Sequence, residues 1–411
     1  RSAGNSDNFH VTLMRLPYDD AEDFKPFNSE GAWSATIVEG GDDFITLRST
    51  VEGSGSDNAQ QTGVKSIEGA GEHPIDFWID FKGTIPEGAT PRCAIVRVRY
   101  HNYTCEHDIF VRQGYAPITI NGNAESNNNP AWTSYNVYRF DANNAPVYTK
   151  SPLEEGSLFR RGNRTAILAS NNDRSGFTFG VEPTGSFNVL EFGSATTSQK
   201  TWSQLAPSAD DVKSRFASWS IAGDHERIAT IEDFYTLEST SIHSNINKAY
   251  GVLYGDGATE TQKSVKEAFG YDHNEDPTNS KKGMRGCFVF NVNNSRNIFF
   301  PIGKSGYGRR KGMTSNGEKV GTLRYAQRTD YYNNDGTGNI QYVPLFYDLF
   351  ERPGAIYQCR NRLESTNNEV KNSSAFDINY FTMGFEGFEN GASNNNNGSD
   401  SDACFIRTVK Y

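Results

Sequence analysis

The sequence predicts a mixed, strand-dominated fold: an all-β sandwich at the amino-terminal side, followed by an α+β domain with little helix. Its 411 residues exceed the usual size of a single hydrophobic core, which favours two domains. Hydrophobic residues make up only 36% of the chain, but aromatic residues reach 13%, enough to build cores from rings and β-branched side chains. The 39 glycines favour turns and loops over long helices.

Charge and hydropathy narrow the classes of partner. Forty basic residues against 50 acidic residues give a net charge of -10, which repels phosphate backbones and anionic lipid surfaces, so we expect no nucleic-acid partner. No stretch approaches the ~20 apolar residues that a membrane-spanning helix needs, so we expect a soluble chain. Residues 1–8 are small and polar and resemble a trimmed terminus, from which a signal peptide, a lipid anchor or a preceding domain could have been removed.

Short strands separated by turns are expected in the first part of the chain. Apolar and polar residues alternate in most of them, as half-buried strands require, and clusters of Gly, Ser, Asp and Pro lie between them. The expected strands are residues 9–13, 33–37, 44–47, 75–81, 94–100 and 109–113. Their spacing of roughly ten residues predicts an antiparallel sandwich of the immunoglobulin type.

Four blocks of this region carry a family resemblance. They are residues 33–35 (WSA), 44–47 (FITL), 92–96 (RCAIV) and 109–113 (IFVRQ). Together they resemble the BACON domain family of Bacteroidetes. The resemblance implies an immunoglobulin-like β-sandwich in an exported protein of that phylum, with a spacer role more common than carbohydrate binding.

A domain boundary is expected within residues 114–130. This segment contains the turn-forming runs NGN at residues 121–123 and NNNP at residues 127–130. We therefore assign residues 1–116 to the sandwich and residues 117–411 to the second domain.

The second domain is predicted to be α+β with a small share of helix. Two short helices are expected at residues 231–238 and 260–269, because each follows a threonine cap with Asp or Gln three residues beyond it. The aromatic-rich segments 346–357 and 376–381 are expected to lie in the core. Strands are expected at residues 165–168, 286–290, 297–300, 355–357 and 404–409.

Three motifs of the second domain carry another resemblance. They are residues 225–234 (HERIATIEDF), residues 299–303 (FFPIG) leading to residues 305–308 (SGYG), and residues 402–410 (DACFIRTVK). In this order they resemble the carboxyl-terminal domains of Bacteroidetes surface and fimbrial tip proteins, which share the C-type-lectin-like fold of formylglycine-generating enzymes. A common version of the last motif has a cysteine where this chain has Thr408, so a family disulfide at that position cannot form here.

Enzymatic chemistry is not expected. Formylglycine generation requires two close reactive cysteines near the end of the domain, but Cys404 stands alone there and Cys359 belongs to a different predicted strand. The other cysteines are Cys93, Cys105 and Cys287, and the absence of a C-x-x-C pair argues against zinc. Cys93 and Cys105 are not expected to form a disulfide, because antiparallel strands at residues 94–100 and 107–113 would hold them far apart.

The histidines and serines do not favour a hydrolytic enzyme either. The seven histidines show no metal-ligand spacing, and the chain has no G-x-S-x-G elbow. His225, just ahead of the first predicted helix, is expected to help hold the helix start rather than to transfer protons.

One segment has the composition of a calcium loop. Asp272, Asn274 and Asp276 place hard oxygen ligands two residues apart, as calcium requires, although the full EF-hand pattern is missing. A solvated acidic turn ending at Pro277 is the alternative. The Asn-rich tip at residues 389–402 has the same two interpretations. No other cofactor is expected.

Two loops have the composition of binding sites. One joins an aromatic ring to cations and the other joins two rings to amides, which suits sugar faces or protein hot spots. Core packing is the alternative for the first ring, since its Gly-Tyr-Gly context belongs to the fold motif. The candidate ligand-binding residues are Tyr307, Arg309, Arg310, Tyr331, Tyr332 and Asn333.

These observations favour a cell-surface adhesin, a fimbrial tip or accessory subunit located on the fimbria or outer membrane. Its partners would be other fimbrial subunits and a host or bacterial surface protein or glycan, bound through loops of the lectin-like domain. The first alternative is an outer-membrane glycan-binding protein for polysaccharide capture. A formylglycine-generating type of enzyme is the second alternative.

Overall fold

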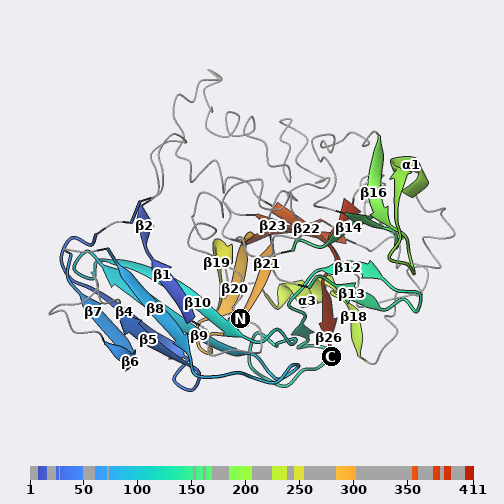
Figure 1. The fold of residues 1–411 in the computed structure, drawn as a ribbon. Helices are drawn as coiled ribbons and strands as arrows, with labels where there is room; N and C mark the ends of the chain where they lie inside the picture. The colour runs from blue at the N-terminus through green and yellow to red at the C-terminus, as the bar shows by residue number, and fades with distance from the viewer. Residues whose placement is uncertain are drawn as a thin grey trace.

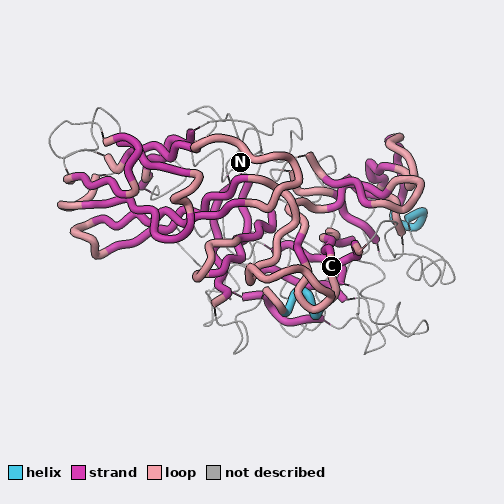
Figure 2. Tube along the Cα trace, turned by 90° about the horizontal axis from the view of Figure 1, so that it is seen from below, coloured by secondary structure: helices cyan, strands magenta, loops and turns pink. Residues whose placement is uncertain are grey.

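A computed structural model describes much of the chain. The described residues are 8–15, 25–26, 28–49, 61–71, 74–150, 154–160, 163–168, 185–205, 225–237, 245–253, 284–301, 354–359, 374–379, 384–389 and 403–411. Over these ranges the chain is mostly strand, with two short helices (Figure 2). Neither helix is long or apolar enough to cross a membrane.

The first part of the chain is a sandwich of two four-stranded antiparallel sheets, drawn in blue to cyan at the left of Figure 1. One sheet has the order β1 (Asn8–Thr12), β8 (Asp76–Phe81), β5 (Ile45–Ser49) and β6 (Thr62–Val64). The other has the order β10 (Cys105–Gln113), β9 (Arg92–Tyr100), β4 (Trp33–Gly40) and β7 (Ser66–Gly69). A separate small pair is formed by β2 (Met14–Arg15) and β3 (Lys25–Pro26).

Both sheets bury alternate side chains against one shared core. Phe77, Ile79 and Phe81 of β8 point inward, while the residues between them are half-exposed, which is the period of two that a strand imposes. Trp33 of β4 is fully buried, and its ring centroid lies 6.5 Å from that of Phe77 in the opposite sheet. The six strands predicted in this region are confirmed, with shifts of a few residues at their ends.

Five sheets make up the described residues beyond 130. The largest has five strands, in the order β17 (Thr197–Thr201), β16 (Ser186–Leu190), β15 (Ala166–Leu168), β14 (Ser157–Arg160) and β25 (Ala403–Cys404). Three sheets have three strands each: β11 (Ala131–Trp132), β26 (Thr408–Lys410) and β18 (Glu226–Ile228) in the first, β19 (Ile246–Leu253), β20 (Met284–Asn291) and β21 (Asn297–Pro301) in the second, and β22 (Gly354–Cys359), β23 (Ser374–Asn379) and β24 (Gly384–Glu389) in the third. The fifth sheet is the pair β12 (Val137–Phe140) and β13 (Pro146–Tyr148). The two helices are α1 (Trp202–Leu205) and α3 (Ile231–Tyr235).

Helix α3 begins at the predicted cap. The Thr230 hydroxyl accepts from the Asp233 backbone N–H, and the Asp233 carboxylate accepts from the Thr230 N–H at 2.8 Å, which completes a capping box. The helix is shorter than predicted and ends at Tyr235, because the next N–H, of Thr236, bonds back to Asp233 in a tighter turn. The helix predicted at residues 260–269 lies outside the described residues.

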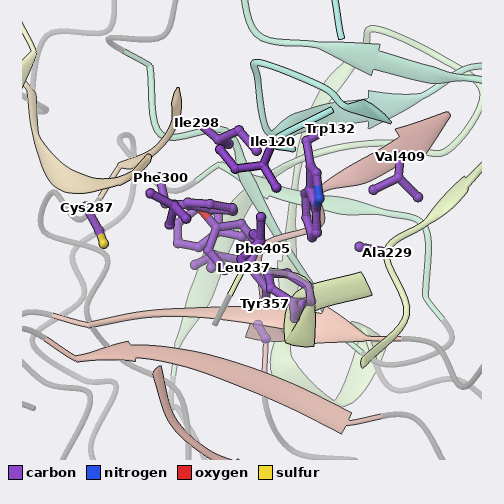
Figure 3. Close-up of a cluster of buried hydrophobic side chains, with 14 of the residues drawn as sticks. Ile120, Trp132, Ala229, Leu237, Cys287, Ile298, Phe300, Tyr357, Phe405 and Val409 are labelled. Carbon is purple, nitrogen blue, oxygen red and sulfur yellow. The ribbon is translucent and has the colours of Figure 1, made fainter. Parts of the chain in front are cut away.

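Aromatic rings pack against one another within the core of this second part (Figure 3). The Trp132 ring lies 4.9 Å from Phe234 and 5.9 Å from Phe300, both edge to face, and Phe300 lies 5.4 Å from Tyr357. Strand β26 pairs with β11 on one side and with β18 on the other, so the last residues of the chain lie beside residues from near position 130. Tyr357 is fully buried, as predicted for its aromatic-rich segment.

Candidate functional site

The loop residues predicted to bind a ligand lie outside the described residues. They are Tyr307, Arg309, Arg310, Tyr331, Tyr332 and Asn333. The predicted calcium ligands, Asp272, Asn274 and Asp276, lie outside them as well. Elsewhere, over the ranges that the structure describes, no group of three or more His, Cys, Asp or Glu side chains could hold a metal ion.

The three motifs of the second part come together in space. Residues 225–234 form β18 and α3, residues 299–301 end β21, and residues 403–410 form β25 and β26. Arg227 pairs with Val409 across β18 and β26. All three motifs contribute side chains to the core around Trp132, so segments that are far apart in the sequence pack together as one unit.

A buried arginine lies at the centre of this unit. Arg407 is fully buried, and its Nε donates to Asn136 Oδ1 at 2.7 Å, its Nη1 to Thr133 O at 2.9 Å and its Nη2 to Phe299 O at 3.0 Å. Its guanidinium carbon lies 4.8 Å from the centre of the Phe300 ring. Three acceptors and an aromatic face thus replace water around this cation.

Burial shifts the titration of this centre. Desolvation lowers the pKa of Arg407 and raises the pKa of Tyr357, whose hydroxyl accepts from Asn136 Nδ2 at 3.1 Å. The raised pKa keeps the Tyr357 phenol neutral, as a hydrogen-bonding group. The chemistry of this centre is structural: it fixes Asn136 and Thr133 against β21.

A second polar cluster explains the threonine at position 408. The Tyr148 hydroxyl donates to Glu226 Oε1, the Thr408 hydroxyl donates to the same oxygen at 2.8 Å, and the Thr133 hydroxyl donates to the Thr408 carbonyl at 2.9 Å. Burial raises the pKa of Glu226, while Thr408 and Lys410 offset part of that rise. The hydroxyl of Thr408 therefore ties β26 to β18 and β13.

His225 does not hold the helix start, contrary to the prediction. It has a φ of 65° and lies ahead of β18, where its carbonyl accepts from the Tyr411 N–H at 2.8 Å and its ring packs edge-on against Tyr411. Thr230 caps the helix, and Arg227 donates to the capping Asp233 at 2.8 Å. His225 lies five positions before Thr230, with the extended strand β18 between them, so its imidazole does not reach the cap.

Three cysteines are described with their side chains, and none of the three forms a disulfide. Cys93 pairs with Arg112 across β9 and β10, whereas Cys105 pairs with Tyr100 at the far end of the same hairpin, which confirms that they cannot form a disulfide. Cys287 is buried in the core of the second part. An isolated bridge between Tyr357 and Phe405 brings the backbone of β22 beside the segment that follows β25.

Arg112 connects the sandwich to the second part of the chain. Its guanidinium donates to Asn297 O at 2.8 Å, to Ser134 Oγ at 2.8 Å and to Ala116 O at 2.9 Å. Arg112 lies near the end of β10, whereas Asn297 begins β21, so one side chain connects two sheets that are distant in sequence. We call this contact region, between the β9–β10 hairpin and the β20–β21 hairpin, the joint.

Aromatic packing extends the joint. Phe110 of β10 lies 5.8 Å from Phe288 and 4.3 Å from Phe290, measured between ring centroids, and Phe288 lies 4.7 Å from Phe299. Figure 1 shows β20 and β21 beside the ends of β9 and β10. Rings from both parts of the chain therefore share one cluster.

The turn of the β20–β21 hairpin closes the joint. Ser295, with a φ of 57°, is fully buried, and its hydroxyl donates to Cys93 O at 2.7 Å. Gly40 makes room for this contact, because a Cβ at its φ of 59° would lie 2.2 Å from the same carbonyl. Burial raises the pKa of the Cys93 thiol, and Arg112 offsets part of that rise. The joint is thus buried at its centre.

One half-exposed ring lies on the outer face of the sandwich. Trp78 of β8 stacks on His10 with ring centroids 4.3 Å apart, and the Arg48 guanidinium lies 4.9 Å from its centre. Because β1 and β5 flank β8 on opposite sides, these two groups cover the indole from both sides. Asp76 contacts His10, and Asp80 binds Arg48 at 2.9 Å. The ring leaves little free face for a sugar to stack on.

Sequence reasoning missed both arginines. Arg407 stands in the apolar run FIRTV, and a lone cation in such a run is a signal of a buried, hydrogen-bonded charge. Arg112 belongs to a strand in which outward cations are ordinary, so its sequence context carries no such signal.

Comparison with known proteins adds no family assignment. A scan against protein-family models gives no match, and a search of the curated proteins finds no significant relative.

Proposed function

We propose that the chain is a non-enzymatic, cell-surface adhesin, a tip or accessory subunit of a fimbria. The sandwich would be an immunoglobulin-like stalk of the BACON type, and the second part would be a head with a C-type-lectin-like fold. Family-like motifs in both parts support this proposal, and so does the strand-rich scaffold, which can carry long loops without disturbing its core.

The joint is the observation that carries the proposal. A stalk that presents a head must keep it at a fixed angle, and here the last sandwich strand holds β21 through Arg112 and holds β20 through Phe110. The buried contact between Ser295 and Cys93 adds a third point of attachment. Three separated contacts define an orientation, which a single flexible linker would not.

The function of the head would be non-covalent capture. The segments at residues 307–311 (YGRRK) and 331–335 (YYNND) would contribute rings, cations and amides suited to protein or sugar surfaces. Many copies on one cell would raise the effective concentration, so weak single contacts would suffice for adhesion.

Isolation from the native cell surface tests the proposal. Surface appendages are sheared from cells, purified by density and probed with an antibody against the chain. We expect the protein in the appendage fraction, and we expect cells without it to adhere less to their surface target. Recovery of the protein free of appendages, together with tight binding of oligosaccharides, would instead support a glycan-binding protein. Turnover of a cysteine-containing peptide would support an enzyme of the formylglycine-generating type.

A further inference from the structure

The turn between β9 and β10 has a strained backbone. His101, Asn102 and Tyr103 follow one another with φ values of 51°, 53° and 66°, in the left-handed region that residues with a side chain rarely adopt. A turn that only reversed the chain could use glycine at these positions without strain. Strain of this kind persists only where the surroundings hold it, and it is concentrated at functional positions.

A neighbouring loop holds this turn in place. The His101 N–H donates to Ser29 Oγ at 2.7 Å, and His101 Nδ1 accepts from the Glu30 N–H at 2.8 Å. Asn102 Oδ1 accepts from the Ala32 N–H at 3.1 Å. Gly31 leaves the space for this amide, because a Cβ there would lie 2.2 Å from Asn102 Oδ1. The imidazole and the amide are therefore both used to brace the turn.

The third side chain, Tyr103, is not used in this way. It is 47% exposed, more than Val38 or Phe192 at 41%, and within the described part of the chain it makes no hydrogen bond or ring contact. A tyrosine on a rigid backbone presents a large amphipathic surface with little entropy to lose, which is the property of a binding hot spot.

The position of the turn relates it to the joint. Cys93 and Arg112 lie at one end of the β9–β10 hairpin, and Tyr103 lies beyond the other end, eight residues of strand or roughly 25 Å away. In a stalk, this end faces away from the head.

We propose that the Tyr103 turn is the docking point of the stalk on a neighbouring protein subunit. This inference rests on the proposed function and names the surface through which the stalk would contact the rest of the appendage. The partner would receive the phenol ring in a pocket. A basic side chain beside that pocket would complement Glu30, whose exposed carboxylate makes no ion pair with the described residues.

Other classes of partner fit this turn less well. A sugar site usually needs an open ring face together with free amides, and the Asn102 amide oxygen already accepts from the Ala32 N–H. The net charge of -10 opposes nucleic acid and anionic lipid.

Photo-crosslinking tests the proposal on the native cell surface. A p-benzoylphenylalanine at position 103 is compared with the same group at position 192, where Phe192 is similarly exposed in the second part of the chain. We expect an adduct with another appendage subunit from position 103 and none from position 192. Equal adducts from both positions, or none from position 103 while the protein is in the appendage fraction, would overturn the proposal.

Substitutions give an independent measurement. Tyr103→Ser should lower the share of protein that co-purifies with sheared appendages at least tenfold, Tyr103→Phe should keep most of it, and Phe192→Ser should leave it unchanged. The midpoint of thermal unfolding should be the same in all of them. Full retention of Tyr103→Ser would reject the docking point alone, whereas wild-type protein outside the appendage fraction would reject the fimbrial function itself.

Discussion

Arg112 and Arg407 donate to two carbonyls of the same strand, β21. Arg112 binds Asn297 O at 2.8 Å and Arg407 binds Phe299 O at 3.0 Å, two residues further along. Both also reach the segment just before Tyr135, because Arg407 donates to Thr133 O at 2.9 Å and Arg112 to Ser134 Oγ at 2.8 Å. One cation comes from the sandwich and the other from the last residues of the chain, so the two parts are aligned on a common strand.

Replacing Arg112 should open the joint. We expect Arg112→Met to lower the free energy of unfolding by about 2–3 kcal/mol, because buried carbonyls lose a charged donor. The rate of iodoacetamide alkylation of Cys93, measured by peptide mass spectrometry, should rise at least tenfold. Loss of the cation alone would raise the pKa of this thiol and slow the reaction, so acceleration reports opening.

Two internal controls accompany this measurement. Cys105 is half-exposed at the other end of the hairpin and should react at an unchanged rate. Arg99→Met removes an exposed arginine that pairs with Glu106, and should change stability by no more than about 0.5 kcal/mol. Cys93 remaining as protected in Arg112→Met as in the wild type would show that the joint does not depend on Arg112.

Replacing Arg407 should destabilise the second part of the chain. Arg407→Met leaves Asn136 Oδ1, Thr133 O and Phe299 O without their donor in a buried core, so we expect the free energy of unfolding to fall by roughly 3–5 kcal/mol. Arg407→Lys should recover only part of this, since an ammonium lacks the planar fork. Urea unfolding followed by tryptophan fluorescence measures both. Lys410→Met, an exposed change on the same strand, should be nearly neutral, and an equally small loss for Arg407→Met would contradict the prediction.

Glu226 should make stability fall as pH rises. Its pKa in the folded state is raised above the ordinary value of 4.5, so between these two values the folded chain holds a proton that the unfolded chain has lost. Relative to Glu226→Gln, the free energy of unfolding of the wild type should therefore decrease from about pH 4.5 through the raised pKa, and stay lower above it. Denaturant unfolding at a series of pH values measures this difference.

Glu191 provides a control of opposite sign. The Ser198 hydroxyl, which donates to it at 2.5 Å, and Lys200 at 2.9 Å lower its pKa. The ionised Glu191 should contribute to stability above its ordinary pKa, and this contribution should disappear as pH falls through the lowered pKa. In Glu191→Gln, this decrease of the free energy of unfolding at acidic pH should be absent. The same pH slope for both variants would show that burial of Glu226 is not the cause.

Alanine substitutions at two glycines distinguish the cost of a steric clash in the joint from the cost of backbone strain. Gly40 and Gly88 have φ values of 59° and 78°, but a Cβ at Gly40 would lie 2.2 Å from Cys93 O, whereas a Cβ at Gly88 has nothing within 4 Å. Gly88→Ala should cost about 1 kcal/mol from conformation alone. Gly40→Ala should cost roughly 2–4 kcal/mol and speed the alkylation of Cys93. Equal costs would mean that the joint adjusts freely at this point.

Much of the fold follows from local patterns. The strands around residues 33–40 and 76–81 were predictable because alternation along a strand is set by the few residues around each position. The cap at Thr230 was predictable for the same reason, since its partner Asp233 is three residues away. Even the separation of Cys93 from Cys105 followed from the pairing of two adjacent strands.

Only the tertiary structure decided where the buried cations and the strained turn lie. Arg407 donates to Asn136, which is 271 positions away in the sequence, and Arg112 donates to Asn297, which is 185 positions away. Every residue has a carbonyl, so a backbone acceptor leaves no mark in the sequence that would identify it as the partner of a distant arginine. The left-handed backbone at Tyr103 likewise depends on a loop some seventy positions earlier, at Ser29 and Ala32.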